Sequence, residues 1–192
     1  GEKGTTLGTG LDRISTRINL DYNVSNRIKF RTDIAYTHSI TDKLYADNVR
    51  SIAYDKMPNM GIYEYDAQGN NTGIFLSPLQ NVQGSYASTY NPVAMLRSAT
   101  NKVTGERITP HFNLQYDFMP NFLKATVDVQ FDIENSKNKS FLPQIATGRP
   151  VSETSVNRAY DGDRDAFRLQ TKTNFVFTPR FGEDHSFIGL IS

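Results

Sequence analysis

Three aspartates alternate along a short polar segment, Asp161-Gly162-Asp163-Arg164-Asp165. Carboxylates at this spacing can wrap a calcium ion, so Asp161, Asp163 and Asp165 form a candidate calcium site. The segment lacks the glycine at position six and the glutamate at position twelve of an EF-hand loop. A polar loop that leads into a strand has the same composition. We favour that second interpretation and predict no metal site.

Seven tyrosines and arginines outside the regular segments are candidates for binding a substrate or a partner protein. Tyrosine rings offer flat apolar faces to a ligand, and arginines bind polar or acidic groups. Loops on a rigid scaffold often carry such residues. The candidates are Tyr63, Tyr65, Tyr86 and Tyr90 in one segment and Arg149, Arg158 and Tyr160 in another. Packing of loop against loop is an alternative role that the sequence leaves open.

No motif in the sequence indicates bond chemistry. The chain has no cysteine, which excludes disulfides, thiolate metal sites and cysteine nucleophiles. It contains no Gly-x-Ser-x-Gly, no His-Glu-x-x-His and no phosphate loop. His38, His111 and His185 lie far apart in sequence, and we interpret them as isolated polar residues. We therefore predict no enzyme, no catalytic residue and no cofactor.

Charge and hydropathy limit the class of protein. The 192 residues include 21 basic and 20 acidic side chains, which gives a net charge of +1. A net charge this close to zero does not indicate the basic surface that binds nucleic acid, so we predict no nucleic-acid partner. No apolar run approaches the roughly 20 residues of a membrane helix. The absence of such a run does not exclude a membrane β-barrel, because only every second residue of its strands is apolar.

Alternation of apolar and polar residues predicts the elements that hold these side chains. It is clearest over residues 123–134, where apolar residues from Leu123 to Ile133 occupy every odd position. Six apolar positions at about 3.4 Å per residue and a tilt near 45° span roughly 24 Å, close to the apolar band of a membrane barrel. The predicted strands cover residues 13–22, 27–38, 107–118, 123–134, 165–177 and 186–192.

The connections between these strands are unequal. Tight turns near residues 25–26, 119–122 and 179–184 join them into three hairpins. Two long loops, 39–105 and 136–164, lie between the hairpins. Short turns on one side and long loops on the other are typical of outer-membrane barrels. The fold class that follows is all-β, an antiparallel up-and-down transmembrane β-barrel segment of about six long strands with two long extracellular loops.

The first long loop contains predicted elements of its own. Within it, residues 61–66 and 72–75 form a small hairpin, and Asn91-Pro92 begins a short helix.

The alternation of the strands also predicts which residues lie opposite one another. Opposite charges across a ladder are favourable by a few tenths of a kcal/mol. The expected cross-strand pairs are Arg17 with Asp33, Asp21 with Lys29, Asp117 with Lys124, and Arg107 with Glu134.

Several strings resemble the SusC/RagA family of TonB-linked outer-membrane proteins. They are INLDYNVSNRIKFRTDIAYTHS (18–39), MPNMGIYEYDAQGN (57–70), YNPVAMLRSATN (90–101), ERITPHFNLQYDFMPNFLKATVDVQFDIENSKNKSFLPQIATGRP (106–150) and SETSVNRAYDGD (152–163). The resemblance covers nearly the whole chain. It implies import of nutrients, mainly glycan oligosaccharides and sometimes peptides, through the outer membrane of a Gram-negative bacterium. It also implies contact with membrane lipid, a SusD-like surface lipoprotein as partner, and energy from the TonB complex.

The chain differs from that family in extent. We find no counterpart of the plug domain or of the segment that contacts TonB, and both ends look interrupted. We therefore expect residues 1–192 to be an internal part of the barrel domain. A soluble secreted all-β carbohydrate-binding module is the alternative, and a glycan-cleaving enzyme is a third that no motif supports.

Overall fold

The chain is all-β, as predicted. The computed structural model describes residues 1–45, 49–56, 59–76, 91–147, 157–181 and 185–192. Of the described residues, 65% lie in strands and 11% in helices. The helices are α1 (Val49–Asp55), α2 (Pro92–Ser98) and α3 (Gln144–Thr147). Among the described residues, no helix is long and apolar enough to cross a membrane.

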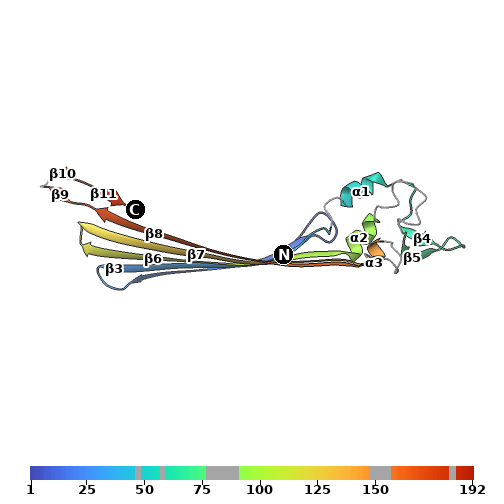
Figure 1. Ribbon diagram of the computed structural model, residues 1–192, viewed down its shortest axis with the longest axis horizontal. Coiled ribbons are helices and arrows are strands. Elements are labelled where there is room, and N and C mark those ends of the chain that lie inside the picture. The colour runs from blue at the N-terminus through green and yellow to red at the C-terminus, as the bar shows by residue number, and fades with distance from the viewer. Residues whose placement is uncertain (46–48, 57–58, 77–90, 148–156, 182–184) are drawn as a thin grey trace. The chain divides into compact units, whose positions relative to one another are not determined.

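One large antiparallel sheet contains the long strands (Figure 1). Its order is β1 (Glu2–Lys3), β2 (Gly10–Asn23), β3 (Ile28–Asp42), β6 (Thr100–Met119), β7 (Leu123–Leu142), β8 (Arg158–Phe177) and β11 (Gly189–Ile191). Two small sheets pair β4 (Tyr63–Tyr65) with β5 (Asn71–Phe75), and β9 (Arg180–Phe181) with β10 (His185–Ser186). The small hairpin predicted within the first long loop is thereby confirmed.

The long strands extend beyond the ends that alternation predicts. Each of β6, β7 and β8 has 20 residues, and segments assigned to the loops 39–105 and 136–164 belong to strands. The extensions, such as 135–140, are polar on both faces, so they show no alternation. Backbone hydrogen bonds to the neighbouring strand hold them instead. The predicted strand 186–192 is divided, because β10 pairs with β9 and only β11 joins the large sheet.

Two of the three predicted tight turns are formed where the sequence predicts them, and the third, near residues 179–184, lies partly outside the described residues. The backbone N–H of Phe122 donates to Met119 O at 3.0 Å, which closes the turn between β6 and β7. Asn121 adopts a φ of 59° there, a left-handed conformation that asparagine tolerates better than most residues. The N–H of Val24 donates to Ile28 O at 3.0 Å between β2 and β3. Both turns fix which strands are neighbours.

The chain divides into two compact units. The first unit comprises Gly1–Asp12, Ser39–Thr104 and Lys137–Asp163, and the second comprises Arg13–His38, Gly105–Ser136 and Arg164–Ser192. The first holds the helices and the β4–β5 hairpin together with the polar ends of the strands. The second holds the parts of the strands in which apolar and polar residues alternate.

The buried core lies in the first unit. Five residues form it, contributed by the three helices and the end of β7: Val49, Ala94, Met95, Leu142 and Ala146. Tyr45, Phe75, Leu96 and Ala99 pack against them. In the described part of the second unit, Ala125 and Pro179 are the buried apolar residues, and no buried cluster includes them. The two units therefore differ in what stabilises them, since only the first has an interior of its own.

Asn91 joins helix α2 to the β4–β5 hairpin. Its side-chain oxygen accepts hydrogen bonds from the backbone N–H of Val93 (3.0 Å) and Ala94 (3.2 Å), which caps the helix. Its amide nitrogen donates to Ile62 O (2.9 Å) and Leu76 O (3.3 Å) beside the hairpin. The predicted helix start at Asn91-Pro92 is confirmed, and the buried Asn91 also holds two distant segments together.

Replacing Asn91 tests this double role. Asn91→Ala removes the cap and the side-chain donor to Ile62 O and Leu76 O, although Ile62 O keeps the backbone N–H of Leu76 at 2.9 Å. The first unit should lose about 2 kcal/mol of stability. Amide hydrogen exchange at Val93, Ala94 and the β4–β5 hairpin measures the loss. Asn91→Asp is the matched comparison, because it keeps an acceptor for the helix cap and replaces the donor by a carboxylate oxygen that the two carbonyl oxygens repel. It should accelerate exchange in the hairpin alone, and equal acceleration in α2 would contradict the assignment.

Candidate functional site

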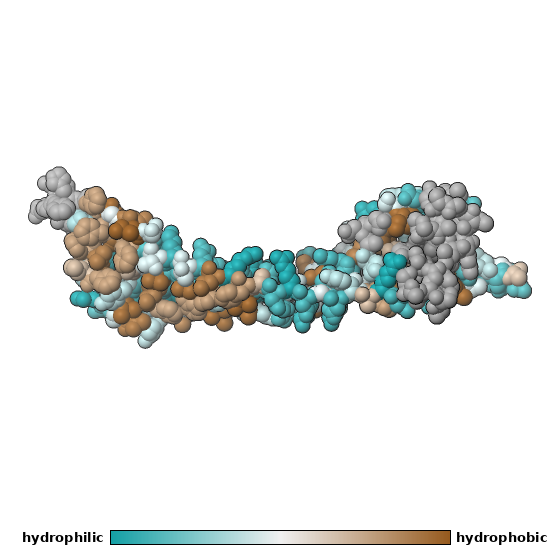
Figure 2. Space-filling view, viewed as in Figure 1, coloured by the Kyte–Doolittle hydropathy of each residue, from teal (hydrophilic) through white to brown (hydrophobic). Residues whose placement is uncertain are grey.

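The sheet in the second unit has one apolar face that nothing covers among the described residues. Ile14 is 66% exposed, Ile18 61% and Phe167 65%. Hydrophobic residues gather over these strands in the space-filling view (Figure 2). Soluble monomers rarely expose contiguous apolar patches larger than a few hundred Å². This face therefore needs an apolar environment or an apolar partner.

A row of phenylalanines crosses four strands on this face. Phe30 of β3 and Phe112 of β6 stack with their ring centroids 6.2 Å apart. Phe112 meets Phe131 of β7 edge-on at 6.3 Å, and Phe131 lies 6.2 Å from Phe167 of β8. Aromatic pairs across neighbouring strands stabilise a sheet beyond the area that they bury. The row fixes which residues of the four strands share one face.

The opposite face is charged and internally paired. Arg17 Nε donates to Asp33 Oδ1 at 2.9 Å, which confirms the predicted pair between β2 and β3. Asp21 pairs with Arg31 at 3.2 Å instead of with Lys29, so this prediction is wrong. The hydroxyls of Ser15 and Thr37, 3.3 Å apart, share the alignment of Asp21 with Arg31. This alignment differs by two residues from the predicted one, so the same residues stay on each face.

A second group of charges continues across β6, β7 and β8. Arg107 makes two hydrogen bonds of 2.8 Å to Asp132, and Arg168 lies 3.7 Å from the same carboxylate. The predicted ion pair of Arg107 with Glu134 is therefore wrong, because Asp132 matches the planar fork of the guanidinium with both oxygens. The structure gives no ion pair between Asp117 and Lys124, the fourth predicted pair, in its described part.

The two described histidine side chains are placed beside carboxylates. His111 Nε2 lies 3.2 Å from Asp128 Oδ1, and His38 Nδ1 lies 3.4 Å from Glu106 Oε1. They therefore lie next to acidic residues of the neighbouring strand, whereas the sequence predicts isolated residues. The side chain of His185 lies outside the described part.

A polar cavity of about 350 Å³ opens on the charged face. Its lining includes Asn19, Asp21, Arg31, Asp33, His111 and Asn113. Hydrogen-bond donors and acceptors of both signs line it, and Asn113 is itself held by Asp128 at 2.7 Å. Such a surface suits water and hydroxyl-rich solutes, because it offers hydrogen-bond donors and acceptors from several side chains.

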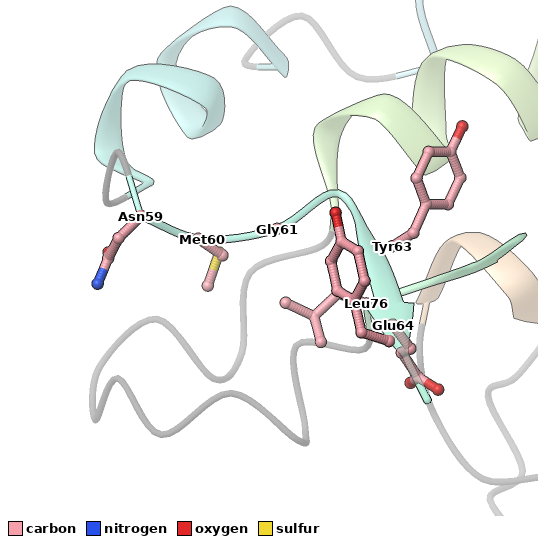
Figure 3. Close-up of a pocket in the computed structure, with 7 residues that line it drawn as sticks. Asn59, Met60, Gly61, Tyr63, Glu64 and Leu76 are labelled. Atoms are coloured by element: carbon pink, nitrogen blue, oxygen red, sulfur yellow. The ribbon is translucent and has the colours of Figure 1, made fainter. Parts of the chain in front are cut away.

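A larger cavity, of about 670 Å³, lies in the first unit beside the β4–β5 hairpin (Figure 3). Two of the predicted binding residues, Tyr63 and Tyr65, line it together with Asn59, Met60, Gly61, Glu64 and Leu76. Tyr65 is 63% exposed. The cavity thus combines an exposed aromatic ring with a carboxylate and an amide.

Tyr63 is held rigidly at this cavity. Its ring stacks on Phe75 across the hairpin with the centroids 5.2 Å apart. Arg97 of α2 donates a hydrogen bond to the Tyr63 hydroxyl at 2.7 Å. Figure 3 shows Tyr63 pointing toward α2, away from Glu64. Tyr63 therefore positions the hairpin, and Tyr65 is the freer of the two rings.

The other predicted binding residues are not brought to this cavity by the described part. Tyr86, Tyr90 and Arg149 lie outside the described residues. Arg158 and Tyr160 lie on β8 and are exposed. A Cβ at Gly162 would lie 2.5 Å from the Tyr160 hydroxyl oxygen, so the Tyr160 ring covers this glycine.

The three aspartates of the calcium candidate are part of strand β8 and not of a loop. Alternate residues of a strand are about 7 Å apart, so their carboxylates do not converge on one ion. Asp161 pairs with Lys139 at 3.3 Å, and Asp165 accepts a hydrogen bond from Asn135. Within the described ranges, no three acidic, histidine or cysteine side chains are grouped as metal ligands.

Sequence reasoning missed several residues of both cavities. Asn59, Met60, Glu64 and Leu76 carry no motif, although the alternation Tyr63-Glu64-Tyr65 indicates a strand with two faces. Arg97 and Asn91 act through contacts with residues far away in sequence. Comparison of the chain with protein-family models and with curated proteins finds no match.

The turn of the hairpin beside the cavity depends on one carboxylate. Asp66 accepts hydrogen bonds from the backbone N–H of Asn70 (2.7 Å) and of Gln68 (3.0 Å), and from the Asn70 side chain (3.1 Å). The backbone bond from Asn70 is the main cause that lowers the pKa of Asp66 below its ordinary value of 3.8. Gly69, with a φ of 81°, lets the chain reverse there.

The stability of this turn should depend on pH. The contribution of Asp66 is present above the pKa of the unfolded chain, about 4, and is lost as the pH falls through the lower folded value. The amide proton shift of Asn70, followed by NMR from pH 7 downwards, should move only below about pH 4. Asp66→Asn is the control and should abolish the transition. A midpoint above 4 would contradict the bond network.

Proposed function

We propose that the chain forms barrel wall and extracellular loops of a TonB-dependent outer-membrane importer that resembles the SusC/RagA family. The observation that carries this proposal is the exposed apolar face on strands of 14 to 20 residues. Strands of about 10 residues tilted near 45° are long enough to cross the apolar part of a membrane. The remaining length of each strand extends into water and explains the polar extensions.

The two faces of the sheet support a membrane wall. The exposed apolar side chains would meet lipid, and the Phe30–Phe167 row would lie on that side. The charged face, with Arg17–Asp33 and Arg107–Asp132, would line a water-filled interior. Paired charges keep the interior polar without a large net potential, which suits the passage of uncharged solutes.

The first unit would face outside and take part in capture. Oligosaccharides, or peptides, are the ligands that the family resemblance suggests, and a SusD-like lipoprotein is the suggested partner. The exposed Tyr65 ring offers a flat apolar face, and Glu64 with Asn59 offers polar contacts. Capture and passage need no bond chemistry, so the proposal includes no catalytic residue. TonB would act through parts of the protein other than these residues.

A soluble carbohydrate-binding module is the second candidate. The observation that favours it is the core of the first unit, which is built without any contribution from a membrane. It would also use the cavity with Tyr63 and Tyr65. The two candidates differ in the environment of the second unit, and this difference can be measured.

Single cysteines on β2 test the membrane wall. The chain has no cysteine of its own, so each label reports one position. We would introduce Ile18→Cys and Leu20→Cys on the apolar face, and Ser15→Cys and Asn19→Cys on the charged face. Each variant would carry an environment-sensitive fluorophore in phosphatidylcholine vesicles. Quenchers in the lipid tails should reach positions 18 and 20, and aqueous iodide should reach positions 15 and 19.

The decisive result is whether the label is quenched from the lipid at positions 18 and 20 and by iodide at positions 15 and 19. A period of two is expected because successive side chains point to opposite faces of a strand. Iodide quenching at all four positions, with the chain remaining in the aqueous phase, would contradict the importer and favour the soluble module. The unlabelled chain and a label at Tyr54, an exposed residue of the first unit, are the controls. The label at Tyr54 should meet water in either case.

A further inference from the structure

The outer edge of β8 is almost entirely unpaired. On one side β8 neighbours β7, and on the other it neighbours only the short β11. The pairing with β11 joins Phe177 to Gly189, Val176 to Leu190 and Phe175 to Ile191. From 164 to 174, the edge has no strand neighbour in the described part of the chain. Unpaired backbone groups along such an edge are a template for a further strand.

The charged side chains of β8 that lie on the charged face of the sheet are basic along this edge. Arg164, Arg168 and Lys172 recur at every fourth position of β8 and so lie on one face. Arg168 lies 3.7 Å from Asp132, but both oxygens of that carboxylate are already bound by Arg107 at 2.8 Å. No ion pair engages Arg164 or Lys172 among the described residues. The row therefore ends at the edge with unneutralised positive charge.

A second copy of the chain does not suit this edge. Two β8 edges brought together would place basic rows near each other, and like charges across a ladder are destabilising. The edge of β2 at the other side of the sheet carries Arg13 and Arg17 on the same charged face. Asp21 lies on that face too, but Arg31 neutralises it, as Asp33 neutralises Arg17. Among the described residues, the charge of β2 left without an ion pair on this face is that of Arg13, so β2 offers no free carboxylate to β8.

We propose that the edge of β8 takes an antiparallel strand with an acidic residue at every fourth position, as the neighbouring strand of the barrel wall. The proposal rests on the proposed function and adds the chemistry of the partner strand. The register of β11 sets the alignment, so the acidic residues lie opposite Lys172, Arg168 and Arg164. Apolar residues of the same strand continue the face of Phe167 and Leu169.

Two synthetic peptides test the charge of the partner strand. Each has about 11 residues, the length of a membrane strand, with apolar residues at alternate positions. One has glutamate at every fourth position and the other has lysine there. Both would be added to the chain in phosphatidylcholine vesicles. Hydrogen exchange of the β8 amides and the anisotropy of a dye on the peptide measure binding.

The glutamate peptide should bind about tenfold more tightly than the lysine peptide, because three favourable pairs replace three unfavourable ones. It should slow exchange at residues 164–174. The double variant Arg164→Glu, Lys172→Glu should reverse the preference. Lys29→Glu with Lys124→Glu is the matched control, because it makes the same change in charge on the inner strands β3 and β7 and should keep the preference. Equal binding of both peptides would overturn the proposal.

A label at Ile18→Cys in the same samples separates this inference from the proposed function. Lipid quenching of the label together with equal binding of both peptides would leave the membrane wall intact and refute only the acidic strand. Iodide quenching of the label would refute the membrane wall, and the acidic wall strand with it.

Discussion

The constraint on which the structure depends is that side chains of a strand alternate between two faces while the backbone pairs sideways. A long strand can therefore separate two environments without breaking one backbone hydrogen bond. β2, β3, β6, β7 and β8 all follow this rule in the second unit, where phenylalanines share one face and ion pairs the other. Because the rule acts on every second residue, a shift by one position would exchange the two environments completely.

Much of the fold could be predicted because that rule is visible in sequence. The alternation around Val127 and Val129 predicts both the strand and its two faces, and the asparagine in the turn at 119–122 predicts the reversal. The cap Asn91 and the following proline predict α2. Each of these signals is local, since the residues that decide the conformation are neighbours in the chain.

The rest depends on contacts that no local pattern reveals. The polar ends of β6 and β7 are strands because a neighbour is present, and their side chains give no sign of it. Arg107 binds Asp132 and not Glu134, and because both are carboxylates on the same face of β7, residue type alone could not decide between them. At the cavity beside Tyr65, Tyr63 is held by Arg97, which lies 34 positions further along the chain. Composition could suggest a binding role for the tyrosines but could not predict which of them lie at the same cavity.

The tight turn at Asn121 has a consequence for the order of folding. It brings β6 and β7 together across a few residues, so the entropy lost on closing that connection is small. β3 and β6 are also neighbours, but the chain must first close the long connection from Asp42 to Thr100. The β6–β7 hairpin, like the β2–β3 hairpin with its own short turn, is therefore expected to form early, and the pairing of β3 with β6 follows later. The core around Met95 eases that later step, because it shortens the free part of the connection when it forms.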